Sequence, residues 1–368
     1  MKISILSMQR IINYGSFLQS YALKKTLEDL GHKVDFIDIQ DGEYHEEPRI
    51  LITSFKDKIK KYCSKDCFKL IKFRIKSKKI ELIMKQEQVD VLGLSQDYIT
   101  KPSPDTEAVV IGSDEVFNCD PRCSWGVSSQ LFGNIDVPIV ITYAASCGFI
   151  KDKDVPKYCI PNIKNSLMKL KSVSVRDENT YDFIKNISNI ESSYNLDPVL
   201  IYPFDFEIKK AEKTIDINEK YMIVYAYEDR IKDKNEINAI KLYAKENGLK
   251  MYCIGGALKW CDDLLILTPF QVLAAFKHAK CIVTDTFHGT IMSAKFNKPF
   301  ATFIRESNEN KLSDLLKRLN LTEHRVNNPS EIKDILSMNR DFVQFNQIVE
   351  SECKKTKQYL MNNLNHKD

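Results

Sequence analysis

The chain has 368 residues, of which 43% are hydrophobic and 28% charged, and a formal net charge of +4. This length exceeds that of most single domains, so two domains of roughly 150 to 200 residues are expected, with the composition of an ordinary globular protein. The net charge is too small to indicate a nucleic-acid partner, and the sequence carries no signature of one.

The N-terminal stretch, MKISILSM, is a short apolar run interrupted by serines, shorter than the apolar region of an export signal. No stretch approaches the roughly 18 uninterrupted apolar residues of a membrane span. The expected location is therefore the cytoplasm. The ten cysteines include no two pairs at zinc-site spacing, so free thiols are expected and no metal site.

The first predicted unit is a strand, a helix and a second strand. Residues 3–7 are expected to form the first strand, and the polar turn QRIINYGS follows it. From Phe17 to Leu30 apolar residues recur at helical spacing, and Gly31 stands where a C-terminal glycine cap is typical. VDFIDI (34–39) is the next strand, so this unit indicates the start of a parallel sheet.

Residues 46–101 differ from the rest of the chain and are predicted to be a basic helical insertion in the first lobe. Between Lys56 and Lys85 there are twelve Lys or Arg residues and three acids, with apolar residues interleaved. The basic face could hold the protein against anionic lipid headgroups at the inner face of a membrane. A solvated helical hairpin is the alternative.

After the insertion the strands resume, and LDPVLIYP (196–203) closes an N-terminal lobe over residues 1–207. Further strands are expected at 108–114, 138–146 and 172–177. The charged stretch 208–220 is the most linker-like segment. Strands and helices alternate again over 221–340 as a C-terminal lobe, and residues 341–368 are expected to hold a final helix that packs across both lobes. The predicted fold is α/β, with two doubly wound, Rossmann-like lobes.

Open parallel sheets bind ligands beyond the carboxyl ends of their strands, where loops and helix N-termini converge. Reactive polar residues of this chain gather at those positions, which indicates an enzyme with a site between the lobes. The residues collected in this way are Asn13, Tyr14, Gly15, Ser113, Asp114, Ser146, Arg176, Asp285, Phe287 and His288.

NYGSFLQ (13–19) makes a glycine turn after the first strand and opens a helix. Backbone N–H groups at a helix N-terminus attract anions such as phosphate or carboxylate. The stretch is neither G-x-G-x-x-G nor a Walker loop, so it does not indicate nicotinamide or ATP binding. The alternative is a plain strand-to-helix turn, in which Gly15 relieves backbone strain and Gln19 lies at the surface.

Two further strand ends carry charge. Asp114 in GSDEVFN could orient a sugar hydroxyl or act as a general base, or it could simply cap a following helix. Arg176 in SVRDENT offers a planar fork suited to carboxylate or phosphate, or it could form a surface pair with Asp177.

TDTFHGTI (284–291) carries the strongest indication of function. His288 lies where a strand passes into a helix, so its imidazole can face a ligand and exchange a proton near neutral pH. Gly289 allows close approach of a ligand, and Asp285 could orient the ring. Further along, Arg305 and Lys311 follow another strand end and supply cations for an anionic group.

The series NYGSFLQSYAL, VIGSDEVFN, TYAASCG, SVSVRDENT, LDPVL and VTDTFHGTIMSAKFNKPF resembles the polysaccharide pyruvyl transferase family, in the same order over residues 3 to 312. The resemblance implies a glycosyltransferase-B-like fold. It also implies transfer of a carboxyethylidene group from phosphoenolpyruvate to two hydroxyls of a sugar, which forms a pyruvate ketal and releases phosphate.

By the same resemblance, Arg176 and His288 match the family's arginine and histidine motifs. Some relatives have a lysine about twenty residues after the histidine, where this chain has Asn308, so Arg305 or Lys311 must substitute. Two further departures are Thr286 in place of the usual serine and Phe117 in place of the commoner tryptophan. The expected catalytic residues are His288 as general acid, Asp114 as base and Arg176 as an anion ligand. The expected substrate-binding residues are Asn13, Tyr14, Gly15, Gln19, Ser113, Asn118, Ser146, Asp285, Thr286, Gly289, Thr290, Arg305 and Lys311.

The implied partners are phosphoenolpyruvate as donor co-substrate and a sugar acceptor, for which a polyprenyl-diphosphate-linked oligosaccharide is one form. Neither a metal nor another cofactor is required. Two alternatives stand beside this interpretation: a nucleotide-sugar glycosyltransferase with the same architecture, and a non-catalytic glycan-binding relative. The identity of the acceptor sugar and the hydroxyls that are bridged do not follow from the sequence.

Overall fold

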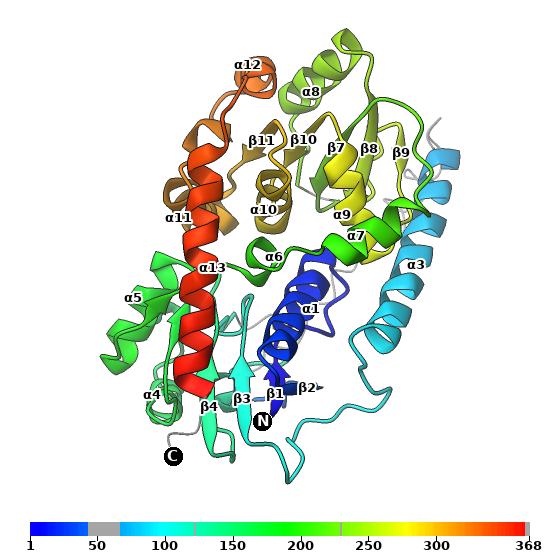
Figure 1. The fold of residues 1–368 in the computed structure, drawn as a ribbon. Helices are drawn as coiled ribbons and strands as arrows, with labels where there is room; N and C mark the ends of the chain where they lie inside the picture. The colour runs from blue at the N-terminus through cyan, green and yellow to red at the C-terminus, as the bar shows by residue number, and fades with distance from the viewer. Residues whose placement is uncertain (43–66, 121–122, 229, 365–368) are drawn as a thin grey trace, which may run out of the picture.

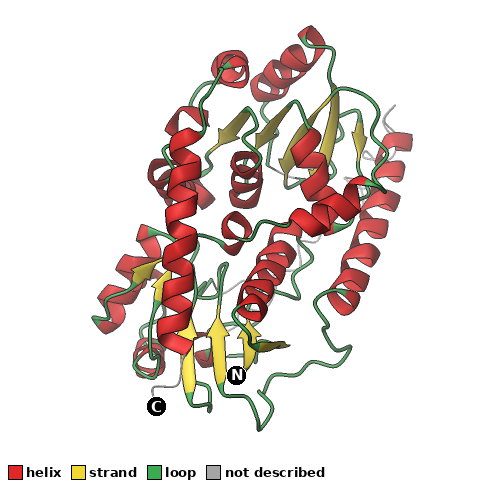
Figure 2. Ribbon diagram, in the orientation of Figure 1, coloured by secondary structure: helices red, strands yellow, loops and turns green. Residues whose placement is uncertain are grey.

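The computed structural model describes residues 1–42, 67–120, 123–228 and 230–364. Within this part of the chain two α/β lobes face each other, one above the other in Figure 1. Helices flank the sheet of each lobe, as the red ribbons of Figure 2 show. The predicted α/β class with two Rossmann-like lobes is confirmed.

The N-terminal lobe is built on a parallel sheet with the strand order β2-β1-β3-β4. Its strands are β1 (Lys2–Leu6), β2 (Lys33–Ile37), β3 (Ala108–Ile111) and β4 (Ile139–Thr142). Beyond β4, isolated bridges join the short parallel pair β5 (Ser174–Val175) and β6 (Ser193–Tyr194). The helices of this lobe are α1 (Tyr14–Asp29), α4 (Ile160–Leu167) and α5 (Glu178–Ser188).

The C-terminal lobe has a six-stranded parallel sheet with the order β12-β11-β10-β7-β8-β9. Its strands are β7 (Tyr221–Ala226), β8 (Lys250–Gly255), β9 (Asp263–Leu264), β10 (Cys281–Thr284), β11 (Phe300–Phe303) and β12 (Arg325–Val326). Its helices are α8 (Lys234–Glu246), α9 (Pro269–His278), α10 (Phe287–Lys295), α11 (Glu309–Arg318) and α12 (Ile332–Ser337).

The central strands form from apolar runs because both faces of each sheet are covered. Every residue of β3, β4, β7, β10 and β11 is buried. Strands buried on both faces appear in sequence as continuous apolar runs rather than as alternating patterns. The parallel register pairs Ile5 with Val110 in one sheet and Ile282 with Ile223 in the other.

The strand order places a switch point in each sheet. From β1 the chain moves to β2 on one side, and β3 then pairs on the other side. In the C-terminal sheet, β8 lies on one side of β7 and β10 on the other. Loops that leave neighbouring strands in opposite directions open a crevice at their carboxyl ends. The loops after β1, β3, β7 and β10 are therefore the walls of the expected site.

The segment that connects the two lobes contains helices that pack against both of them. LDPVLIYP contains α6 (Pro198–Ile201), and the segment expected as a linker over 208–220 begins inside α7 (Asp205–Glu212). Ile208 and Ala211 of α7 are buried in a hydrophobic cluster that includes residues of both lobes. Only 213–220 lies outside regular secondary structure, so the expected linker is shorter than the charge pattern indicates.

The last helix, α13 (Val343–Leu364), runs along both lobes (Figure 1). Phe345 near its start joins the cluster shared by the lobes, whereas Leu360 and Leu364 near its end are buried against strands β1, β3 and β4. The Tyr359 hydroxyl donates a hydrogen bond of 2.8 Å to the carbonyl of Thr142. The helix thus contributes to the cores of both lobes.

The described part of the basic insertion contains α3 (Cys67–Asp90), whereas residues 43–66 lie outside the described ranges. Three of its lysines turn toward the C-terminal lobe. Lys69 donates to the carbonyl of Cys261 at 2.6 Å, and Lys72 and Lys76 contact the Asp263 carboxylate at 3.1 and 2.7 Å. The side of α3 that faces the C-terminal lobe therefore carries lysines as well. Among the described helices, none is long and apolar enough to cross a membrane.

Candidate active site

The loops that leave β1, β3, β7 and β10 line a cavity of about 360 Å³ between the lobes. Asn13 enters it from the loop after β1, and Asp114 from the loop after β3. Arg230 follows β7, and His288 follows β10. Each switch point thus supplies two polar side chains, as the strand order requires.

His288 is held at the first turn of α10. The Thr286 hydroxyl caps this helix by accepting a hydrogen bond of 2.9 Å from the Gly289 amide. The imidazole packs on Gly15 in the first turn of α1, where a Cβ atom would lie 2.2 Å from the His288 ring. A glycine is therefore required at position 15 for the histidine to occupy this place.

A buried carboxylate joins His288 to Arg176. Asp197 Oδ2 lies 2.9 Å from Arg176 Nη1 and 3.5 Å from His288 Nε2. Burial alone would raise the pKa of Asp197, but the neighbouring imidazole and guanidinium hold that pKa below its usual value. The Arg176 guanidinium also lies over the Phe287 ring, 4.1 Å from its centroid. Asp197 is thus placed to orient the imidazole.

Asp114 stands at the edge of the cavity beside this network. Its Oδ1 is 3.5 Å from Arg176 Nη2, and its Oδ2 accepts a hydrogen bond of 2.9 Å from the Ser16 hydroxyl. Its φ angle is +74°, a left-handed conformation that directs the side chain away from the strand path. A carboxylate so placed can accept a proton from a hydroxyl that enters the cavity.

Glu115 and Lys311 form an ion pair that spans the cavity wall between the lobes. The attraction of Lys311 lowers the pKa of Glu115 to about 2, against the opposing effect of burial. Asn118 adds a hydrogen bond of 2.9 Å to the other carboxylate oxygen. The charge of Lys311 is therefore largely balanced by Glu115.

Arg305 turns away from the cavity. It makes a bidentate pair with Glu236 at 2.7 and 2.8 Å, and its Nε lies 3.6 Å from Asp285 Oδ2. Burial raises the pKa of Asp285 to about 6, although Arg230 and Arg305 oppose this. Of the two cations considered for the same role, Lys311 lines the cavity and Arg305 does not.

Arg230 is the cation that the sequence interpretation missed. It lines the cavity, and its guanidinium lies 5.2 Å from the centroid of the Tyr227 ring. Within the described ranges, no carboxylate lies at ion-pair distance from it. A ligand anion in the cavity would thus meet a guanidinium that none of the described carboxylates holds in an ion pair.

The structure brings half of the sixteen predicted site residues to one place. Gly15 and Arg176 lie directly behind the cavity, against His288 and Asp114. The predicted residues that line the cavity are Asn13, Asp114, Asn118, Thr286, His288 and Lys311. Phe287, which was collected with the strand-end residues, lines it as well.

Several predicted binding residues are instead buried in the protein and do not line this cavity, contrary to the expectation that they contact the substrate there. Gln19 donates to the Ser7 and Ser20 hydroxyls and accepts from Ser113, so both its amide atoms are engaged. Ser146 donates to Asp177 at 2.7 Å. Thr290, Gly289 and Asp285 are likewise buried behind the wall. Tyr14 does not line this cavity either: its hydroxyl donates to the Leu267 carbonyl, and its side chain lines a second cavity described below. Their role is to fix the loops and helix N-termini.

Asp197 and Arg230 could not be identified from strand ends alone. Asp197 precedes the short helix α6, which it caps by accepting a hydrogen bond of 3.0 Å from the Val199 amide. Its only signal in the sequence is the LDPVL motif, which names no role. Arg230 lies in a charged loop among other charged residues, where nothing distinguishes it.

A second cavity, of about 320 Å³, adjoins the first. It lies between the N-terminus of α1, the end of β7 and the inner side of α3. The two cavities share Asn13, Tyr225, Tyr227 and Thr286. Ile80 and Met84 of α3 give the second cavity an apolar side.

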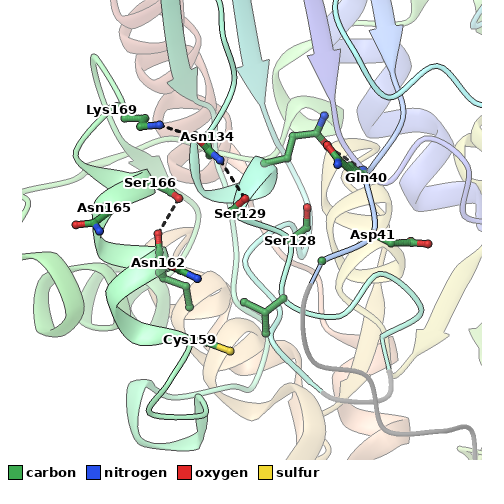
Figure 3. A pocket seen from close by; sticks show the side chains of 14 residues that line it. Gln40, Asp41, Ser128, Ser129, Asn134, Cys159, Asn162, Asn165, Ser166 and Lys169 are labelled. Carbon is green, nitrogen blue, oxygen red and sulfur yellow. Dashed lines mark hydrogen bonds between the residues drawn. The ribbon is translucent and has the colours of Figure 1, made fainter.

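The hollow of Figure 3, about 560 Å³, lies in the N-terminal lobe between η1 (Ser129–Phe132) and α4. Its polar side chains bond to one another: Lys169 donates to Asn134 at 2.5 Å, and Asn134 donates to Ser129 at 3.3 Å. None of the residues predicted for the site lines it. In the described ranges, no group of three or more metal-ligating side chains lies together.

Two Rossmann-like lobes with a polar cavity at the carboxyl ends of their strands define a protein of the glycosyltransferase-B type. A family model described as polysaccharide pyruvyl transferase matches residues 13–307. The chain belongs to this family, and membership places it among the transferases of polysaccharide biosynthesis. No curated protein matches the chain by sequence.

Solved structures resemble the chain weakly. UGT89C1 of Arabidopsis thaliana, complexed with UDP-L-rhamnose, is 8% identical with a TM-score of 0.49, and the match covers 98% of both chains. The UDP-GlcNAc 2-epimerase of Methanocaldococcus jannaschii is 10% identical with a TM-score of 0.49, covering 98% of this chain and 99% of that one. The corresponding epimerase of Neisseria meningitidis, bound to UDP-GlcNAc, is 10% identical with a TM-score of 0.47 and 99% coverage of both chains.

Proposed function

We propose that the protein transfers a carboxyethylidene group from phosphoenolpyruvate to two hydroxyls of a sugar, forming a cyclic pyruvate ketal and releasing phosphate. One observation carries the proposal: a cavity between the lobes joins a histidine backed by a buried carboxylate, a second carboxylate, and cations from both lobes. Such a set can bind a dianionic donor and move protons at both of its reacting ends.

The donor's phosphate and carboxylate are proposed to bind on the side of the cavity formed by the C-terminal lobe. Arg230 supplies a guanidinium that pairs with none of the described carboxylates, and Lys311, which is shared with Glu115, supplies a second cation. The N-termini of α1 and α10 meet at Gly15 and His288, and the positive ends of the two helix dipoles add positive potential. Arg176 contributes its charge from behind Asp114.

The proposed reaction proceeds in two additions. Protonated His288 gives its proton to the methylene carbon of phosphoenolpyruvate while the first sugar hydroxyl adds to the adjacent carbon and loses its proton to Asp114. Phosphate then departs and takes the proton from Asp114. The second hydroxyl of the same sugar adds to the resulting cation and returns a proton to His288. Bonds and protons balance, so phosphoenolpyruvate is the only co-substrate and no further cofactor is needed.

The acceptor is proposed to occupy the second cavity, because this cavity adjoins the first and shares four lining residues with it. The Tyr227 ring, 47% exposed, offers a flat face to a sugar, and Asn13 holds the Tyr227 hydroxyl at 3.0 Å. Ile80 and Met84 supply apolar contacts that would also suit the attachment of a lipid-linked saccharide.

The test is phosphate release from phosphoenolpyruvate with a panel of galactosyl, glucosyl and N-acetylmannosaminyl acceptors. Mass spectrometry should detect an acceptor heavier by pyruvate less water. His288→Ala should reduce turnover by at least about 100-fold, whereas His278→Ala, which removes an exposed imidazole bound to Glu212, should not. Near-normal release from His288→Ala, or transfer from a nucleotide sugar with none from phosphoenolpyruvate, would refute the proposal.

A further inference from the structure

The outer side of α3 carries an apolar stripe that no described residue covers. Ile71, Ile75, Leu82 and Val89 are 43%, 54%, 67% and 38% exposed. At 3.6 residues per turn these four positions fall within an arc of about 40° on the helix surface. Exposed apolar residues scattered singly are common, but a row along one helix indicates a surface that is covered when the protein works.

Basic side chains border the stripe on both sides. By the same helical spacing, Arg74, Lys78 and Lys85 lie along one border and Lys79 along the other, where Lys72 instead contacts Asp263 of the C-terminal lobe. All five are exposed. Two acids stand along these borders: Glu81, which pairs with Lys85, and Asp90 at the end of the helix. An apolar row between two basic rows is the pattern of helices that lie in the interface of an anionic bilayer.

The inner side of α3 fixes which face points outward. Phe73 is buried in the core of the C-terminal lobe, and Met84 in the cluster shared by both lobes. Lys76 donates to Asp263 and to the Leu264 carbonyl at 2.7 and 3.0 Å. The helix cannot turn its stripe inward without breaking these contacts. Figure 1 shows α3 along the outer edge of the molecule.

We infer that the outer face of α3, defined by residues 71–89, docks the protein on a membrane surface rich in anionic lipid. The stripe inserts between headgroups while the basic borders contact their phosphates. The inner side of the same helix lines the second cavity with Ser77, Ile80, Glu81 and Met84. Docking therefore brings that cavity beside the bilayer, where a lipid-linked saccharide is presented. Vesicle binding itself does not depend on the proposed reaction.

The first test measures co-sedimentation of the full chain with vesicles of phosphatidylcholine alone and with added phosphatidylglycerol. Binding should require the anionic lipid and should weaken as salt is raised. Each Lys near an anionic surface contributes about fivefold, so Lys78→Gln, Lys79→Gln and Lys85→Gln together should lower the partition coefficient roughly 100-fold. The matched control changes Lys354, Lys355 and Lys357, exposed on α13, to Gln and should leave it unchanged. Equal loss in both triple variants would overturn the inference.

The second test reports on the stripe itself. Leu82→Trp should shift its fluorescence to shorter wavelength when anionic vesicles are added, whereas Met361→Trp, at a 46% exposed position on α13, should not. Ile75→Ser with Leu82→Ser should reduce binding about tenfold or more at constant salt. No shift for Leu82→Trp refutes docking. If the unchanged protein is a dimer that does not bind vesicles, and the serine variants are monomers, then the stripe contacts a second copy of the chain and not a membrane.

Discussion

Replacing Arg230 with Met should weaken phosphoenolpyruvate binding without destabilising the protein. In the described ranges no carboxylate lies at ion-pair distance from Arg230, and buried Asp285, which Arg230 attracts from further away, keeps its contact with Arg305. A hydrogen bond to a charged group contributes about 1.5 to 3 kcal/mol. Because about 1.4 kcal/mol is a factor of ten, the dissociation constant should rise roughly 10- to 100-fold.

Arg305→Met is the matched comparison and should show the opposite pattern. Its charge is already cancelled by the bidentate pair with Glu236, so phosphoenolpyruvate binding should change less than about threefold. The variant leaves Glu236, which is 9% exposed, without its partner, so the free energy of unfolding should fall by about 2 to 3 kcal/mol.

The assay is calorimetric titration of each variant with phosphoenolpyruvate in the absence of acceptor, together with urea unfolding. This choice separates donor binding from turnover and does not require the acceptor to be known. If Arg305→Met weakens binding more than Arg230→Met does, the assignment of the donor site to Arg230 is wrong. Normal binding by both variants would exclude this side of the cavity as the anion site.

Three further predictions concern the same loops and the core. Gly15→Ala would place a Cβ atom 2.2 Å from the His288 ring, so turnover should fall about 100-fold while the circular dichroism spectrum is retained. Lys311→Met should lower the free energy of unfolding at pH 7 by about 2 kcal/mol, because it strands a carboxylate whose pKa the pair holds at about 2, and adding Glu115→Gln should restore most of this loss. Burial lowers the pKa of His324 to about 4, so on acidification the unfolded chain binds a proton at a higher pH than the folded protein does. The free energy of unfolding should therefore fall by about 3 kcal/mol between about pH 6.5 and pH 4, and His324→Phe should remove this dependence on pH.

Each of these has a result that would contradict it. Unchanged turnover in Gly15→Ala would mean that His288 is free to move from its observed place. A Glu115→Gln addition that fails to restore Lys311→Met would show that the loss is one of packing rather than of charge. A pH slope that persists in His324→Phe would assign it to other groups.

The fold could be predicted from the sequence because strands and helices leave patterns within short segments of the chain. Parallel strands buried on both faces appear as apolar runs, and the residues after them, such as Asp114 and His288, must meet at one edge of a sheet. Asn13 and Thr286, which were predicted as binding residues, each cap the start of a helix, and both line the cavity.

The direction of each side chain was not visible in the same way. Gln19 and Ser113 belong to the predicted motifs but face each other inside the N-terminal lobe, because the turns before them point those positions inward. The position of Asp197 is set by the segment that crosses between the lobes, which brings its carboxylate against Arg176 and His288. These contacts join residues distant in sequence. The choice between Lys311 and Arg305 depended on acids distant in sequence, Glu115 and Glu236, which no spacing could indicate.

The placement of α13 bears on how the chain folds during synthesis. Leu360 and Leu364 complete the core around β1, β3 and β4, although about 220 residues separate them from the end of β4. Domains generally fold in order as they leave the ribosome, but here the N-terminal lobe must wait for the end of the chain before its core is closed. Until then the apolar face of the N-terminal sheet that Leu360 and Leu364 cover is exposed to solvent. We therefore expect this lobe to need chaperones during translation and to be poorly soluble when it is expressed without α13.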